Sequence, residues 1–153
     1  MEQPGLEFAF RISVDLTAGI QEVGDTGKGI RKVVSITGGT IEGPNIKGKV
    51  VAGGYDWQLL RADGVVEIDA RYLLQTDDGD LITITNTGLR HGPPEVMARL
   101  VAGEDVDPAE YYFRTVPEFI APNGPYEWLN KSIFVCAGAR YASGIRMWVW
   151  RVT

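Results

Sequence analysis

Asp56 and two mid-strand arginines, Arg71 and Arg114, are the side chains best suited to chemistry in this chain. A carboxylate can act as a general base, or it can accept a hydrogen bond from a ligand hydroxyl. A guanidinium binds a carboxylate or an enolate oxygen through two parallel hydrogen bonds and stabilises negative charge that develops there. The three residues therefore predict one shared cavity, with Asp56 as the base and both arginines at an enolate-like oxygen.

A further acid and several aromatic and amide side chains complete the predicted site. Glu118 follows Pro117, and burial would tune the pKa of its carboxyl for proton transfer, which makes it a fourth catalytic candidate. Aromatic walls and an orienting amide are typical of small-molecule pockets. The candidates for ligand binding are Trp57, Tyr72, Tyr112, Trp128 and Asn130.

Each candidate also has a structural interpretation. Asp56 follows two glycines, and an aspartate in a turn commonly accepts hydrogen bonds from backbone N–H groups. Arginines in the middle of strands often form exposed cross-strand pairs, and Glu118 could simply pair with Arg114. Trp128 is equally typical of a core residue and Asn130 of a turn. Because one sequence does not determine strand order, the inward placement of the arginines is a hypothesis.

The composition predicts no metal, flavin or nucleotide cofactor. The chain has one histidine, His91, and one cysteine, Cys136, which is too few for a His/Cys zinc site. Gly27-Lys28 lacks the spacing of a phosphate-binding loop, and Gly38-Gly39 lacks that of a dinucleotide-binding turn. The acidic run 77–80 resembles a calcium loop in composition, but hairpin-turn chemistry explains it better. We therefore expect neither a catalytic role for His91 nor a nucleophilic one for Cys136, which is typical of a small core residue.

The elements that would position these residues are strands. Apolar and polar residues alternate over residues 6–16, the pattern of a half-buried strand. Further short strand candidates follow, separated by glycine-rich turns, with a turn region over residues 19–29. The predicted strands are 31–37, 46–52, 56–62, 65–76, 81–88, 111–116, 133–141 and 145–152. Pro94–Ala102 is the single predicted helix, preceded by Pro93 and followed by Gly103.

These elements predict one all-β domain over residues 1–153, a closed antiparallel barrel of about eight strands with one short helix. A barrel of this size can be filled by side chains or can hold one small ligand. The net charge of −5 argues against nucleic acid and against an anionic membrane surface as partners. The lone cysteine, the alternating start of the chain and the lack of a long apolar run favour a cytoplasmic protein. A homo-oligomer remains open.

Six short sequence motifs, in this order along the chain, resemble those of a known family. They are residues 38–44 (Gly-Gly-Thr-Ile-Glu-Gly-Pro), 53–57 (Gly-Gly-Tyr-Asp-Trp), 69–72 (Asp-Ala-Arg-Tyr), 76–79 (Thr-Asp-Asp-Gly), 112–119 (Tyr-Phe-Arg-Thr-Val-Pro-Glu-Phe) and 126–130 (Tyr-Glu-Trp-Leu-Asn). Over nearly its whole length the chain resembles domain-of-unknown-function family 3237, a group of uncharacterised bacterial and fungal proteins. The resemblance implies a one-domain barrel of about eight antiparallel strands and no established activity. Ile120 departs from the family pattern, which often has a second acid there, so a scheme with paired acids at that point is not supported.

Three functional hypotheses follow. The first is a cofactor-independent isomerase, cyclase or lyase that acts on a small carbonyl-containing or aromatic metabolite. The second is a carrier or sensor that binds a small hydrophobic acid without turnover, and the third is a structural oligomer with a filled barrel. Interior volume distinguishes the third from the others, and a shifted acid pKa in the cavity favours the first over the second. Arginines without matching acids would favour an anionic or enolisable ligand.

Overall fold

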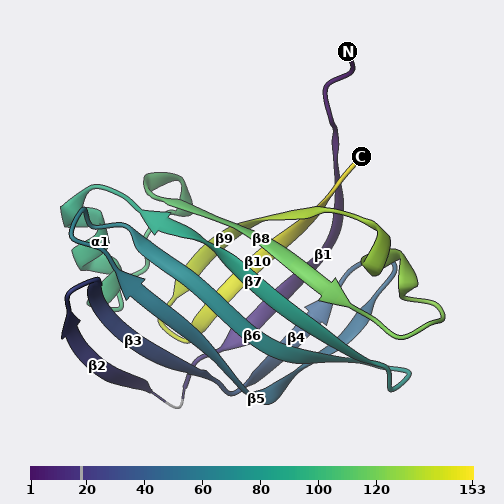
Figure 1. Cartoon of the computed structure of the whole chain (residues 1–153), viewed down its shortest axis with the longest axis horizontal. Coiled ribbons are helices and arrows are strands. Elements are labelled where there is room, and N and C mark those ends of the chain that lie inside the picture. Colours follow the sequence, from purple (N-terminus) through teal and green to yellow (C-terminus); the bar gives the residue numbers. More distant parts are fainter. Residues whose placement is uncertain (18) are drawn as a thin grey trace.

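The protein is an antiparallel sheet that closes on itself, seen in a computed structural model that describes residues 1–17 and 19–153 (Figure 1). The described strands are β1 (Leu6–Asp15), β2 (Ile20–Thr26), β3 (Gly29–Ile36), β4 (Gly38–Glu42), β5 (Lys47–Leu60), β6 (Val66–Thr76), β7 (Leu81–His91), β8 (Tyr112–Ile120), β9 (Phe134–Tyr141) and β10 (Gly144–Val152). They are joined by the helix α1 (Pro94–Val101) and the 3-10 turns η1 (Pro108–Glu110) and η2 (Glu127–Lys131).

Eight of these strands form the ring of the barrel, in the order β5-β4-β1-β10-β9-β8-β7-β6, and the pairing of β5 with β6 closes it. β5 is long enough to pair with β4 at its start and with β3 from Gly54 to Leu60. β2 then pairs with β3, so β2 and β3 form a hairpin that extends the wall at one end. The predicted closed barrel of about eight strands with one short helix is confirmed.

Alternation along the strands decides which side chains enter the barrel. In β8, for example, Phe113, Thr115 and Phe119 are buried, whereas Arg114 and Glu118 are exposed. Successive residues of a strand point to opposite faces of the sheet, so one register places every second side chain in the core. β6 and β7 show the same alternation.

Three local predictions need correction. The glycine-rich region 19–29 contains β2, which escaped notice because its side chains are mostly exposed and show no buried face. Gly38 and Gly39 begin a strand, β4, rather than end one. The strands predicted at 46–52 and 56–62 are one strand, β5, interrupted by an irregularity between Val51 and Tyr55. A Cβ at Gly54 would lie 2.4 Å from the Cβ of Tyr72, so this bend requires a glycine.

The two ends of the barrel differ. At one end the aromatic rings of Phe10, Phe119 and Phe134 lie in contact, with centroids 5.5 Å and 5.2 Å apart for successive pairs, and Trp128 of η2 lies 6.1 Å from Phe134. At the other end the β2–β3 hairpin, α1 and the β9–β10 turn surround an opening (Figure 1). We call these the closed end and the mouth. Among the described residues, no helix has the length and hydrophobicity of a transmembrane helix.

Candidate functional site

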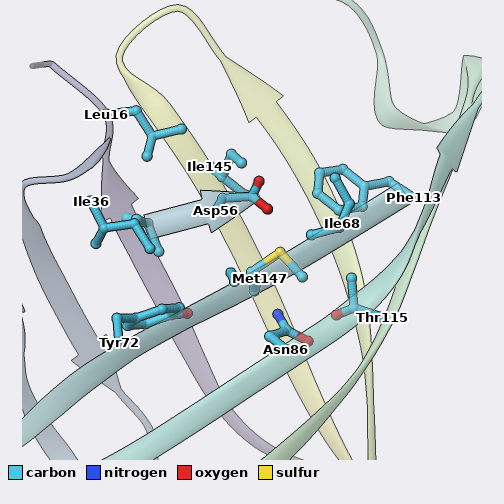
Figure 2. A pocket seen from close by; sticks show the side chains of 12 residues that line it. Leu16, Ile36, Asp56, Ile68, Tyr72, Asn86, Phe113, Thr115, Ile145 and Met147 are labelled. Carbon is cyan, nitrogen blue, oxygen red and sulfur yellow. The ribbon is translucent and has the colours of Figure 1, made fainter. Parts of the chain in front are cut away.

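A small cavity with four polar side chains lies inside the barrel, between the closed end and the mouth. Its volume is about 30 Å³, room for about one water molecule. Apolar residues from β1, β3, β6, β8 and β10 form most of its wall. The polar side chains are Asp56, Tyr72, Asn86 and Thr115, and Figure 2 shows the Asp56 carboxylate pointing into the space above Met147.

Asp56 is the titratable group at the centre of this cavity, and only 5% of its surface is exposed. Its Oδ2 accepts a hydrogen bond from Nε2 of Gln58 at 2.8 Å, and its Oδ1 accepts one from the backbone N–H of Asp69 at 3.2 Å. Burial raises the pKa of the Asp56 carboxyl, and this effect outweighs the two hydrogen bonds and the nearby positive charge of Arg90, which lower it. The carboxyl therefore holds its proton to a higher pH than an ordinary aspartate does.

A second, larger pocket opens at the mouth. Its volume is about 550 Å³, within the range of small-molecule sites. Leu16 and Ile145 line both this pocket and the inner cavity, so the two spaces adjoin. The polar and charged side chains around the mouth pocket are Lys32, Gln58, Asp63, Arg90, Arg140 and Tyr141.

Arg90 is the most deeply buried charged group of the mouth pocket, with 3% of its surface exposed. Its guanidinium carbon lies 5.2 Å from the ring centroid of Phe113. Among the residues that the structure describes, Nε and Nη1 of Arg90 have no hydrogen-bond partner. Burial, and then the positive charge of Arg140, lower the pKa of Arg90 to about 10, so the guanidinium remains charged at neutral pH.

Arg140 is half-buried at the end of β9, on the rim of the same pocket. Its backbone N–H donates to the hydroxyl of Tyr111 at 2.9 Å, which holds the end of β9 against the start of β8. Burial lowers the pKa of the Arg140 guanidinium as well. The mouth thus brings together two partly desolvated cations from β7 and β9.

The predicted convergence of Asp56, Arg71 and Arg114 in one cavity is wrong. Arg71 lies on the outer wall with 70% of its side chain exposed, 3.8 Å from Asp69 Oδ1. Arg114 also lies outside, where its Nη1 donates to the backbone carbonyl of Phe113 at 2.9 Å and its guanidinium covers Tyr112. Both arginines are next in sequence to inward-facing residues, and the pleat of the strand turns them outward.

The remaining predicted residues are divided between three places. Tyr72 lines the inner cavity, where burial raises the pKa of its hydroxyl and keeps it neutral. Trp57, Tyr112 and Glu118 are exposed on the outer wall. The other two residues, which belong to η2, lie at the closed end: Trp128 beside Phe134, and Asn130, whose side chain bonds to the backbone N–H and carbonyl of Ala121 at 2.7 Å and 2.8 Å.

The two residues set aside in the sequence do not line the mouth pocket. His91 is exposed and stacks on Tyr112 with centroids 4.9 Å apart. Cys136 is buried, and burial raises the pKa of its thiol to about 12, so it stays protonated. In the described part of the chain, no three His, Cys, Asp or Glu side chains form a group that could hold a metal ion.

Sequence reasoning missed all the polar and charged residues of the mouth pocket, including Gln58, Arg90 and Arg140. A signal for them existed in the two-residue period of the strands. Gln58 lies two positions after Asp56 on the same face of β5, and Arg90 lies four positions after Asn86 on the same face of β7. Arg140 lies four positions after the buried Cys136 along β9.

Together, the fold and the pocket define an antiparallel β-barrel with an aromatic closed end and a mostly apolar mouth that carries two arginines. The chain belongs to the family described as "Protein of unknown function (DUF3237)", whose model matches residues 4–152. This finding confirms the family resemblance of the sequence phrases.

Several relatives cover most of the chain. A protein called "UPF0311 protein" from Rhodopseudomonas palustris (strain TIE-1) is 36% identical over 143 residues, which is 93% of this chain and 94% of the relative. The crystal structure of a conserved protein of unknown function from Rhodopseudomonas palustris superimposes with a TM-score of 0.93 at 33% identity, covering 100% of this chain and 99% of the other. A "Hydroalkoxylation enzyme phnH" from Penicillium herquei is 41% identical over 85 residues, 55% of each protein.

Proposed function

We propose that this protein is a cofactor-independent isomerase, cyclase or lyase that moves a proton on a small carbonyl-containing or aromatic metabolite. The observation that carries the proposal is the buried Asp56 carboxyl, whose raised pKa suits a general acid and base. The pocket at the mouth, next to the cavity of Asp56, supplies space for the ligand.

Gln58 and Arg90 would assist Asp56 in this reaction. Gln58 donates to Asp56 Oδ2 and also lines the mouth pocket, so it holds the carboxyl in place directly below a bound ligand. Arg90 would stabilise negative charge that develops on a ligand oxygen when a proton leaves the neighbouring carbon. The inner cavity has room for one water, through which the proton can pass between Asp56 and the ligand.

The fungal relative supports a reaction of this type. Its name describes a hydroalkoxylation, the addition of an O–H group across a carbon–carbon double bond. Such an addition needs a proton donor for one carbon of the double bond, and a buried carboxyl with a raised pKa is suited to that role. The inner volume of about 30 Å³ alone would also fit a filled barrel, but the mouth pocket of about 550 Å³ favours a ligand.

The test is proton exchange and cyclisation measured by proton NMR in D2O. Purified protein is incubated with a panel of enolisable aromatic ketones and of phenols that carry a neighbouring alkene. We expect exchange or ring closure faster than in buffer for at least one compound, and a loss of about 100-fold or more in Asp56→Asn. Asp77→Asn, which removes an exposed carboxylate at the closed end, is the control and should keep the full rate.

Two results would contradict the proposal. Turnover that is unchanged in Asp56→Asn would remove Asp56 from the chemistry. Compounds that bind at the mouth without any exchange or cyclisation across the panel would favour the alternative hypothesis, a carrier or sensor.

A further inference from the structure

The mouth pocket has two positive charges that no acidic side chain balances. Of its other charged residues, Lys32 lies 3.6 Å from Glu22, and Asp63 forms an ion pair with Arg61. Among the described residues, neither Arg90 nor Arg140 lies within ion-pair distance of a carboxylate. This excess of positive charge contrasts with the net charge of −5 of the whole chain.

The charge of Asp56 acts on Arg90, but Asp56 is a poor counterion. Both of its oxygens already accept hydrogen bonds, from Gln58 and from the backbone of Asp69. Burial also raises the pKa of its carboxyl, which disfavours the charged form. The guanidinium of Arg90 therefore keeps two donors, Nε–H and Nη1–H, that no described residue engages.

A buried cation with free donors is costly unless an anion comes to it. Among anions, a carboxylate matches a guanidinium best, because its two oxygens can accept two parallel hydrogen bonds. A second guanidinium at the rim, that of Arg140, adds attraction for the same group. The chemistry of the pocket's polar side thus selects an organic acid rather than a neutral molecule.

The rest of the pocket is apolar and sets the other half of the ligand. Ile30 of β3, Leu60 of β5 and Met97 and Leu100 of α1 line the wall around the arginines. These side chains offer contact to a hydrocarbon or aromatic body, and they exclude water from the ion pair. A small apolar molecule with one acidic group fits both halves.

We propose that Arg90 and Arg140 bind the carboxylate of a small aromatic or apolar acid, whose body packs against α1 and the β2–β3 hairpin. This inference rests on the proposed function, since it names the substrate class of the same pocket. The carboxylate lies at the arginines, and the body of the acid extends toward Gln58 and the cavity of Asp56. The arginines thereby position the reacting carbon for proton transfer.

The experiment is isothermal titration calorimetry at pH 7 with three acids, benzoate, cinnamate and 2-naphthoate, each compared with its neutral amide. We expect the wild type to bind at least one acid about tenfold or more tightly than its amide. In Arg90→Met and Arg140→Met this preference should fall to less than about threefold. Arg90→Lys, which retains the positive charge but lacks the planar guanidinium, should keep part of the preference for the acid over its amide.

Arg71→Met is the matched control, because it removes an arginine from the outer wall of the same barrel. It should retain the full preference for acids. Equal affinity for acid and amide in the wild type across all three pairs overturns the inference, as does an undiminished preference in both mouth variants. Circular dichroism and thermal melts of each variant confirm that the barrel is folded.

Asp56→Asn separates this inference from the proposed function. It should keep the acid preference, because the carboxylate binds at Arg90 and Arg140. If Asp56→Asn has no effect on turnover, the proposed function fails while the acid preference stands. If turnover depends on Asp56 but acids and amides bind equally, the assigned substrate class fails while proton transfer stands.

Discussion

The closed end and the mouth of this barrel are formed by the same strands but differ in chemistry. Along β5, β7 and β9, polar inward residues follow apolar ones toward the mouth, where they meet apolar side chains such as Leu60. The series are Val50, Asp56 and Gln58 on β5; Ile82, Ile84, Asn86 and Arg90 on β7; and Phe134, Cys136 and Arg140 on β9. The largest aromatic contacts lie at one end of the ring, and Arg90, whose donors have no partner among the described residues, lies at the other.

The comparison suggests how a small barrel accommodates a site that is unfavourable for folding. The aromatic cluster of Phe10, Phe119 and Phe134 buries large apolar surfaces at the closed end. Arg90 buries a charge without partners among the described residues. Functional sites commonly reduce stability in this way, and the closed end offsets the cost.

The largest expected effect comes from the closed end. Phe134→Ala removes a ring that contacts both Phe119 and Trp128, and a fully buried Phe→Ala change typically costs about 3–5 kcal/mol of unfolding free energy. Urea denaturation followed by circular dichroism measures the loss. Met97→Ala, at the half-buried wall of the mouth, should cost clearly less, and equal losses would contradict the division into two ends.

The intermediate effect has the opposite sign. Arg90→Met keeps the apolar contact with Phe113 and removes two buried donors without partners among the described residues, so it should raise the unfolding free energy by about 1–3 kcal/mol. Asp56 does not become a stranded charge in this variant, because its carboxyl can take up a proton. Arg71→Met should change stability by less than about 0.5 kcal/mol in the same urea experiment. A destabilised Arg90→Met would show that the arginine is structural.

The smallest effect is a pH dependence of stability at Asp56. The carboxyl has a higher pKa in the folded protein than the ordinary value of 3.8, so folding favours its protonated form. Its contribution to stability is complete below about pH 4 and is lost as the pH rises through the folded pKa. Thermal melts from pH 2 to pH 8 should therefore show the stability of Asp56→Asn increasing relative to that of the wild type as the pH rises.

Asp63 provides a control of opposite sign for this pH series. Its hydrogen bonds with Arg61 lower the pKa of its carboxyl to about 2. The stability that Asp63 contributes is present above the ordinary value of 3.8 and is lost as the pH falls through about 2. Asp63→Asn should thus differ most from the wild type at neutral pH and least in strong acid. Parallel pH curves for both variants would contradict the burial of Asp56.

Much of the secondary structure follows from local patterns. The helix predicted at Pro94–Ala102 is α1 at Pro94–Val101, because Pro93 and Pro94 mark its start and Gly103 follows its end. The alternating strands were recognised wherever one face is buried. β2 was missed because neither of its faces is buried, and β5 was divided in two because the irregularity near Gly54 interrupts its alternation.

The site shows where local reasoning ends. The two-residue period of a strand separates neighbours such as Asp56 from Trp57 and Tyr72 from Arg71, but it does not say which set is inside. Both sets here contain large apolar side chains, because Tyr55, Trp57 and Leu73 are exposed on the outer wall. Hydrophobicity along β6 could therefore not decide whether the face that carries Arg71 or the face that carries Tyr72 lies inside the barrel.

The sequence by itself determined the barrel class, the short helix, the family and the candidacy of Asp56, because each depends on local spacing or on phrases of the chain. Only the tertiary structure decided which arginines meet the pocket. Arg90 and Arg140 lie fifty positions apart on β7 and β9, and β8 stands between these strands in the ring. Closure of the sheet into a barrel points both arginine side chains into the mouth pocket. The closure depends on all eight strands together.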